Sequence, residues 1–272
     1  MIINIKYYIY LLKIAYNSYN IYINKFYTML NLKQIQQNNI DGMFLGLDVE
    51  SGDTTNLDKV MSIGYAVVDV KGNLIEKNTI YFPFHESDLQ YDKSPYDAFT
   101  FWTINNKNIY EKHVEESKKL GFDPNHTFPI NTKSKEFKKC VTDCMKKLSD
   151  TLFRIQNEYN ILAIVTDCQY DTTVINHLLW KILNEPSLIM RRVFKDNKKS
   201  FVWNINCIDT GSFVASVYPN VKNLKMSETF FIESNKLLIP DSIITHTHSP
   251  DDDCERMLME FLIIWNYCLE SK

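Results

Sequence analysis

The order of strand-like and helix-like segments is the feature that most restricts the fold of this chain. Three runs with strand character come first, at residues 43–50, 60–70 and 74–83, and a turn at residues 71–73 joins the last two as a hairpin. A helical pattern over residues 134–160 then leads into a buried strand at 161–167. Further elements follow, with helices at 172–183 and 250–267 and a strand at 201–209. This order predicts an α/β domain in which helices lie on the faces of a sheet.

The first 28 residues differ in composition from the rest of the chain. They hold seven of the 16 tyrosines, three lysines and no acidic residue. Their longest uncharged apolar run is too short to span a bilayer, and no small-residue cleavage site follows it. We therefore interpret residues 1–40 as an N-terminal extension outside the core and residues 41–272 as the domain, with Met29 as the expected start of translation in place of Met1. An amphipathic surface anchor is the alternative for this segment.

The charge and the cysteines exclude several classes of protein. A net charge of −3 over 272 residues argues against a basic surface that coats long stretches of phosphate backbone. A small nucleic-acid footprint remains compatible, because bound metal ions can face the phosphates in place of lysines. The six cysteines include no C-x-x-C pair, which argues against a zinc site or a disulfide framework. We expect a soluble, intracellular protein with reduced cysteines and no membrane partner.

Two carboxylates lie close together at the polar end of the first strand. Asp48 and Glu50 are two residues apart, and side chains at this spacing in a strand point to the same face. Like charges so close repel and raise each other's pKa unless a cation lies between them. The pair is therefore a candidate divalent-metal site, although a strand end followed by a solvated loop gives the same residue types without a metal.

Asp171 follows the buried strand at 161–167 after a short loop. Ligands in open α/β sheets gather beyond the carboxyl ends of the strands, so Asp171 is a second candidate ligand. The alternative is that Asp171 is only the N-cap of the helix at 172–183. Asp167, four residues earlier, is a further candidate ligand or a hydrogen-bonding support.

The most informative cluster is THTHSPDDDCERMLMEFLII at residues 245–264. Ser249 suits an N-cap and Pro250 the first helical position, so a capped helix explains these residues and the acids that follow. Helix capping does not explain His248, just before the cap, or Asp253, at the end of the first turn. An imidazole beside a carboxylate suits a general base, because imidazole titrates near neutrality.

In this order the motifs resemble the DEDDh group of the RNase H-like 3′→5′ exonucleases, which includes RNase T and the proofreading exonuclease subunits. The resemblance consists of D-x-E on the first strand, Y-D after a buried strand, and His, four residues and Asp entering the last helix. It extends from about Met43 to the C-terminus. It implies an RNase H-like mixed sheet, in which three antiparallel N-terminal strands precede parallel strands, flanked by helices.

The resemblance also implies an activity. Four metal ligands would hold two Mg²⁺ or Mn²⁺ ions and His248 would activate water, the ligands being Asp48, Glu50, Asp171 and Asp253. The chain would then be a 3′→5′ exonuclease, a phosphodiester hydrolase that releases nucleoside 5′-monophosphates from single-stranded RNA or DNA 3′ ends, with RNA slightly favoured. The alternative from another class is a catalytically idle nucleic-acid-binding or scaffold protein that keeps the fold. Members similar to RNase T often pair, which leaves a homodimer open.

Two further segments resemble the exoribonuclease branch of this group. In YDAFTFWTIN, residues 96–105, Phe101 and Trp102 would stack on or shape the site for terminal bases, and core packing is the alternative for Trp102. Ser51 would also contact substrate, although many relatives have threonine there. In NCIDTGSFVA, residues 206–215, Asp209 ends a strand.

Two ambiguities remain in the sequence. His246 and Asp251 repeat the spacing of His248 and Asp253, and we prefer the second pair because Cys254 supplies the small residue that follows the aspartate in the family. The basic stretch RRVFKDNKK, residues 191–199, is either a guide for the nucleic-acid strand or a solvated loop at a helix end.

Overall fold

The computed structural model describes residues 41–89, 97–126, 131–132, 134–203, 205–212 and 247–270. Contacts within the chain divide it into two compact units, Met1–Asp41 and Gly42–Lys272. The predictions made for residues 1–40 lie outside the described residues. The sheet, its helices and the candidate site all belong to the second unit.

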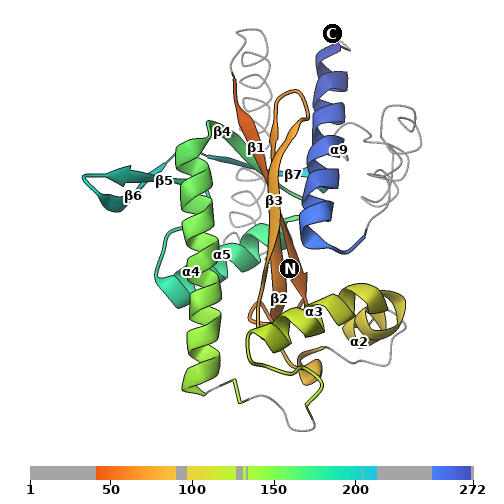
Figure 1. Ribbon diagram of the computed structural model, residues 1–272. Helices are drawn as coiled ribbons and strands as arrows, with labels where there is room; N and C mark the ends of the chain where they lie inside the picture. Colours follow the sequence, from red (N-terminus) through yellow and green to blue (C-terminus); the bar gives the residue numbers. More distant parts are fainter. Residues whose placement is uncertain are drawn as a thin grey trace, which may run out of the picture. The chain divides into compact units, whose positions relative to one another are not determined.

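A five-stranded mixed sheet forms the centre of this unit (Figure 1). Its strands are β1 (Met43–Ser51), β2 (Val60–Asp69), β3 (Leu74–Tyr81), β4 (Ile161–Thr166) and β7 (Asn206–Asp209). They lie in the order β3-β2-β1-β4-β7, and β1, β2 and β3 pair antiparallel whereas β4 pairs parallel with both β1 and β7. The predicted α/β class and mixed sheet are confirmed, and the arrangement is compatible with an RNase H-like fold.

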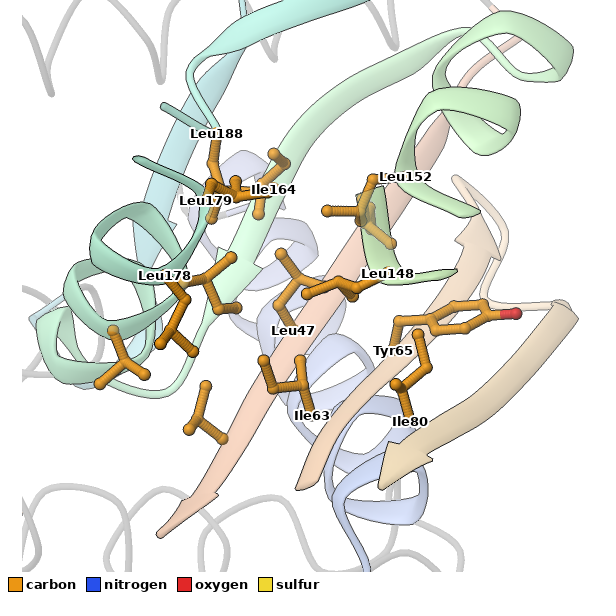
Figure 2. Close-up of a cluster of buried hydrophobic side chains, with 14 of the residues drawn as sticks. Leu47, Ile63, Tyr65, Ile80, Leu148, Leu152, Ile164, Leu178, Leu179 and Leu188 are labelled. Carbon is orange, nitrogen blue, oxygen red and sulfur yellow. The ribbon is translucent and has the colours of Figure 1, made fainter. Parts of the chain in front are cut away.

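Helices cover both faces of the sheet, because β1 carries apolar side chains on one face along its length and at its start on the other. Leu45, Leu47 and Val49 point to the face covered by α4 (Lys135–Glu158) and α5 (Gln169–Leu183), where they join the main hydrophobic cluster (Figure 2). Phe44 points to the other face and packs edge-on against Phe261 of α9 (Pro250–Glu270), with ring centroids 5.1 Å apart. The even-numbered residues of β1, which include the two acids, therefore face α9.

Two glycines let α9 approach the sheet closely. A Cβ atom on Gly64 of β2 would lie 2.2 Å from the carbonyl carbon of Pro250, and one on Gly46 of β1 would lie 3.0 Å from the carbonyl oxygen of Cys254. A side chain at Gly64 would therefore push the first turn of α9 away from the strands.

The connection between β3 and α4 is more regular than the sequence predicted. It contains the 3₁₀ turn η1 (Glu86–Asp88), the single helical turn α2 (Ala98–Thr100), the π-helical turn η2 (Phe101–Asn105) and the helix α3 (Lys107–Lys119). These elements position the aromatic residues that the sequence had placed only in a connection.

Two interpretations of residues 191–209 were wrong, that of a loop at a helix end and that of one unbroken strand at 201–209. The expected helix-end loop and the single strand at 201–209 are instead a hairpin, β5 (Met190–Lys195) and β6 (Lys198–Trp203), followed by the separate strand β7. The hairpin forms its own two-stranded sheet. Asp196 and Asn197 at its turn have φ of 52° and 58°, the positive values that a tight two-residue hairpin turn requires.

Among the helices that the structure describes, none is both long and apolar enough to cross a membrane.

Candidate active site

All eight predicted site residues line one cavity of about 370 Å³. It lies where the end of β1, the first turns of α5 and α9, and η2 meet. The predicted residues in its lining are Asp48, Glu50, Ser51, Phe101, Trp102, Asp171, His248 and Asp253. The structure therefore brings together residues from four separate parts of the sequence, which include the three motifs.

Asp48 and Glu50 reach the cavity from the α9 face of β1. In the antiparallel ladder Asp48 lies opposite Gly64 and Glu50 opposite Ser62, so no large side chain of β2 separates the two acids from α9. The Oδ2 atom of Asp48 is buried and accepts no hydrogen bond within the part of the chain that the structure describes. A buried carboxylate oxygen without a donor is costly, and a bound cation would remove that cost.

Asp171 enters the cavity from the first turn of α5, with 3% of its surface exposed. The prediction that it is the N-cap is wrong: α5 begins at Gln169 and Cys168 is the N-cap, so Asp171 is the third helical residue and closes a capping box. Its Oδ2 accepts a hydrogen bond from the backbone N–H of Cys168 at 3.4 Å. Burial raises the pKa of Asp171 to about 7, although hydrogen bonds from backbone N–H groups oppose the rise.

His248 and Asp253 come from the segment that leads into α9. The Oδ1 atom of Asp253 accepts a hydrogen bond from the N–H of Thr247 at 3.1 Å, and Asp253 is 3% exposed. His248 has a φ of 56°, in the left-handed region that histidine adopts at some cost in backbone energy. Its Nδ1 lies 3.9 Å from Oε1 of Glu50, and its ring packs edge-on against Phe101 with centroids 4.8 Å apart. Packing thus holds the imidazole beside the carboxylates.

The alternative pair of His246 and Asp251 is only partly covered by the structure. His246 lies outside the described residues. Asp251 accepts a hydrogen bond from the hydroxyl of Ser249 at 3.0 Å and does not belong to the cavity lining. Of the two aspartates, Asp253 is the one that reaches the site.

Negative charge dominates the electrostatics of the cavity. Burial raises the pKa of Asp48 well above its usual value, and the neighbouring carboxylates of Asp171 and Asp253 raise it further. Burial, followed by the charge of Asp48, raises the pKa of Glu50 in the same way. The carboxyl groups of Asp48, Glu50 and Asp171 are therefore hard to ionise together, and a bound cation would favour their charged forms.

The donor atoms suit a hard divalent cation. Ligand atoms of Glu50, His248 and Asp253 all lie within 4.8 Å of one another, close enough to hold one ion. The carboxylate oxygens of this cluster suit Mg²⁺ or Mn²⁺. Cys168 also lines the cavity, but its soft sulfur does not suit Mg²⁺ or Mn²⁺. The assignment of four carboxylates to two ions, with His248 as a base, stays a prediction.

Two roles were considered for Trp102, contact with a terminal base and packing in the core, and its burial distinguishes them. Only 2% of Trp102 is exposed, and its Nε1–H donates a hydrogen bond to the carbonyl oxygen of Ser51 at 3.1 Å. Trp102 is therefore packed in the core and shapes one wall of the cavity. Phe101, which is only partly buried, presents its ring to the cavity.

Tyr170 and Arg256 also line the cavity, and the sequence analysis gave neither a role. Tyr170 donates a hydrogen bond from its hydroxyl to Oγ of Ser51 at 2.9 Å and joins α5 to the end of β1. Arg256 places Nε 4.0 Å from Oδ1 of Asp253 and pairs with Glu260 at 2.7 Å. Arg256 is three residues after Asp253 on a helix, and this spacing was the available signal.

Asp167 has the supporting position that was one of its two predicted roles. Its Oδ1 accepts a hydrogen bond from the hydroxyl of Thr210 at 3.3 Å, and Asp167 also lines the cavity. Thr210 follows Asp209 at the end of β7, so the last strand of the sheet is tied to the site. The side chain of Asp209 instead accepts the N–H of Ser212 at 2.6 Å.

No protein-family model matches this chain, and no curated protein matches it significantly. What the protein does must therefore be inferred from its own residues and their geometry.

Proposed function

We propose that this protein is a metal-dependent 3′→5′ exonuclease that releases nucleoside 5′-monophosphates from single-stranded nucleic acid, with RNA slightly preferred over DNA. One observation carries the proposal: four carboxylates and a histidine, supplied by β1, α5 and the start of α9, line one cavity. Burying so many acids in one place destabilises a fold unless they bind a cation.

In this proposal the four carboxylates would hold two Mg²⁺ or Mn²⁺ ions, the ligands being Asp48, Glu50, Asp171 and Asp253. When bound, such ions neutralise charge on the scissile phosphate and acidify a water molecule. The raised pKa values of Asp48, Glu50 and Asp171 support this role, because these groups gain most from a nearby positive charge.

His248 would take the proton from the attacking water at an imidazole nitrogen. The water oxygen bonds to phosphorus, the bond between phosphorus and the 3′ oxygen breaks, and that oxygen takes up a proton. Contacts with Phe101 and Trp102 hold the ring in place, as a base that must meet a water in one geometry requires.

The size of the cavity supports action at a strand end. A volume of about 370 Å³ is at the lower end of small-ligand sites, so it suits one terminal nucleotide better than a duplex. Phe101 offers a stackable ring to the terminal base.

The test is hydrolysis of single-stranded RNA and DNA by the purified full chain in Mg²⁺, Mn²⁺ or EDTA. We expect stepwise shortening of 5′-labelled strands and release of nucleoside 5′-monophosphates, with no reaction in EDTA. Asp48→Asn should abolish hydrolysis, whereas Asp252→Asn, which removes an acid that pairs with Lys77 outside the cavity, should not. Strand binding without hydrolysis under all metal conditions would instead favour the idle binding protein.

A further inference from the structure

The β5–β6 hairpin carries a concentrated positive charge that the active site does not use. Residues 190–203 include five basic residues and one acidic residue, a net charge of +4 in a chain whose total is −3. Figure 1 shows the hairpin on the side of α4 away from α9.

The cross-strand register places basic side chains on the outer face of this hairpin. Lys195 lies opposite Lys198, and directly opposed residues of an antiparallel pair share a face. Arg191 instead donates a hydrogen bond to the carbonyl oxygen of Gln156 at 3.5 Å. Lys195 and Lys198 are exposed, and neither forms an ion pair with a residue in the described ranges. Lys199, on the inner face, is by contrast paired with Glu185 at 2.8 Å. The charge on the outer face is thus available to a partner.

An exposed aromatic ring lies at the same end of the hairpin, on the inner face. Phe194 is directly opposite Lys199 and one residue before Lys195. It is 65% exposed, and its ring packs edge-on against the buried ring of Phe153 with centroids 4.4 Å apart. Phe153 therefore fixes Phe194 without covering it. Protection of an exposed strand edge would explain the lysines, but it does not account for an exposed aromatic ring at the same hairpin end.

Resting on the proposed function, we propose that the β5–β6 hairpin binds a single nucleic-acid strand several nucleotides away from the 3′ end held in the cavity. A strand that crosses the turn end of the hairpin would meet both faces, so that Lys195 and Lys198 contact phosphates and Phe194 stacks on a base. This combination is found where proteins hold single strands without sequence preference. Charge complementarity favours a polyanion as the occupant.

The separation between the cavity and the β5–β6 hairpin sets how long a nucleic-acid strand must be to reach both. The first turn of α5 lines the cavity and its last turn leads toward the hairpin. A helix of 15 residues is about 22 Å long, so a strand must extend well beyond one or two nucleotides to reach the hairpin. Short oligonucleotides should therefore bind only at the cavity.

The test compares 20-nucleotide and 4-nucleotide single strands by fluorescence anisotropy in Mn²⁺, with every variant made on a His248→Ala background to slow hydrolysis while keeping the metal. We expect the added Lys195→Glu/Lys198→Glu changes to weaken binding of the long strand at least tenfold and to leave binding of the short strand within twofold of the His248→Ala protein. The slope of log affinity against log salt for the long strand should fall by about 1.4, the value for two lost phosphate contacts. The Phe194→Leu variant should weaken long-strand binding without changing this slope.

A matched control changes the same charge elsewhere. Lys135 and Lys139 are exposed in the first turns of α4, at the end distant from the hairpin, so Lys135→Glu/Lys139→Glu should leave both affinities unchanged. Thermal unfolding midpoints equal to that of the unmodified protein would establish that the variants fold. The inference would be overturned if the Lys195→Glu/Lys198→Glu variant lost no affinity or lost affinity equally for both strand lengths. It would also be overturned if the control variant lost as much affinity for the long strand. If long strands bind through the hairpin but no metal supports hydrolysis, the proposed function fails and the hairpin inference stands.

Discussion

Removing divalent metal should make this protein lose stability as the pH rises. Burial raises the pKa of Asp171 from 3.8 to about 7, so the folded state keeps a proton that the unfolded state releases. This contribution to stability is fully present below pH 3.8 and is lost as the pH rises through 7. A rise of this size corresponds to about 4 kcal/mol in the free energy of unfolding. Asp48 and Glu50 shift in the same direction and add to the effect.

A bound cation should replace the protons and remove this dependence. Mn²⁺ at 100 times its dissociation constant stabilises the folded state by about 2.7 kcal/mol, and its affinity rises as the carboxylates lose their protons. The gain in stability from Mn²⁺ should therefore be small at pH 5 and large at pH 8. For a domain of this length, the loss in EDTA corresponds to a fall of about 10 °C in Tm between pH 4 and pH 7.5.

The assay is thermal unfolding from pH 4 to pH 8, in EDTA and in Mn²⁺, for the unmodified protein and for Asp171→Asn. The variant should show a flatter pH dependence in EDTA, because its amide does not titrate. Asp252→Asn, whose side chain pairs with Lys77 outside the cavity, is the control and should retain the full slope. A stability in EDTA that increases between pH 4 and pH 7, or a gain from Mn²⁺ that is equal at pH 5 and pH 8, would refute the reasoning.

Three further predictions concern the base, a buried arginine and the N-terminus. His248→Ala should lower the rate of hydrolysis by about 10²–10⁴-fold and keep Mn²⁺ affinity, whereas Asp48→Asn should lose both hydrolysis and Mn²⁺ binding. His246→Ala should change little. If His246→Ala were inactive, the histidine–aspartate motif would shift by two residues to His246 and Asp251. The wild-type rate should rise through the pH range in which histidine titrates. Arg192→Met should stabilise the fold by about 1–3 kcal/mol in urea unfolding. The guanidinium of Arg192 is buried, its pKa is lowered to about 10 by that burial, and it has no hydrogen-bond partner within the described ranges. A loss of stability in the variant would contradict this prediction. Deleting residues 1–28 should leave folding and activity intact, and loss of folded protein on truncation would show that interpretation to be wrong.

The parts of the fold that the sequence predicted are those in which apolar periodicity and burial agree. In β1 the alternation of Leu45, Leu47 and Val49 with the acids required one face to be apolar and the other to carry Asp48 and Glu50. The structure has this arrangement. The convergence of the three motifs could be expected because each follows the end of a buried strand or begins a helix beside one.

The parts that the sequence did not predict lack such a pattern. In β5 and β6, basic residues occupy both faces of the hairpin, so no apolar period of two marks the strands. The strands are specified instead by the turn at Asp196 and Asn197 and by packing against α4, including the contact between Phe194 and Phe153. The turn residues are a local signal, whereas the packing against α4 depends on tertiary contacts and cannot be read from a window of sequence.

Packing of α9 on the sheet distinguishes the pair His248 and Asp253 from the pair His246 and Asp251, which the sequence left open. Asp48 lies opposite Gly64, and the backbone of Pro250 occupies the space that a side chain at Gly64 would fill. The first turn of α9 is therefore held directly over the strand position beside Asp48. With the helix fixed there, Asp251 remains in the cap while Asp253, half a turn further along, reaches the cavity. The glycine opposite the first aspartate, together with the small Cys254 against Gly46, thus determines which acid of the last helix joins the site.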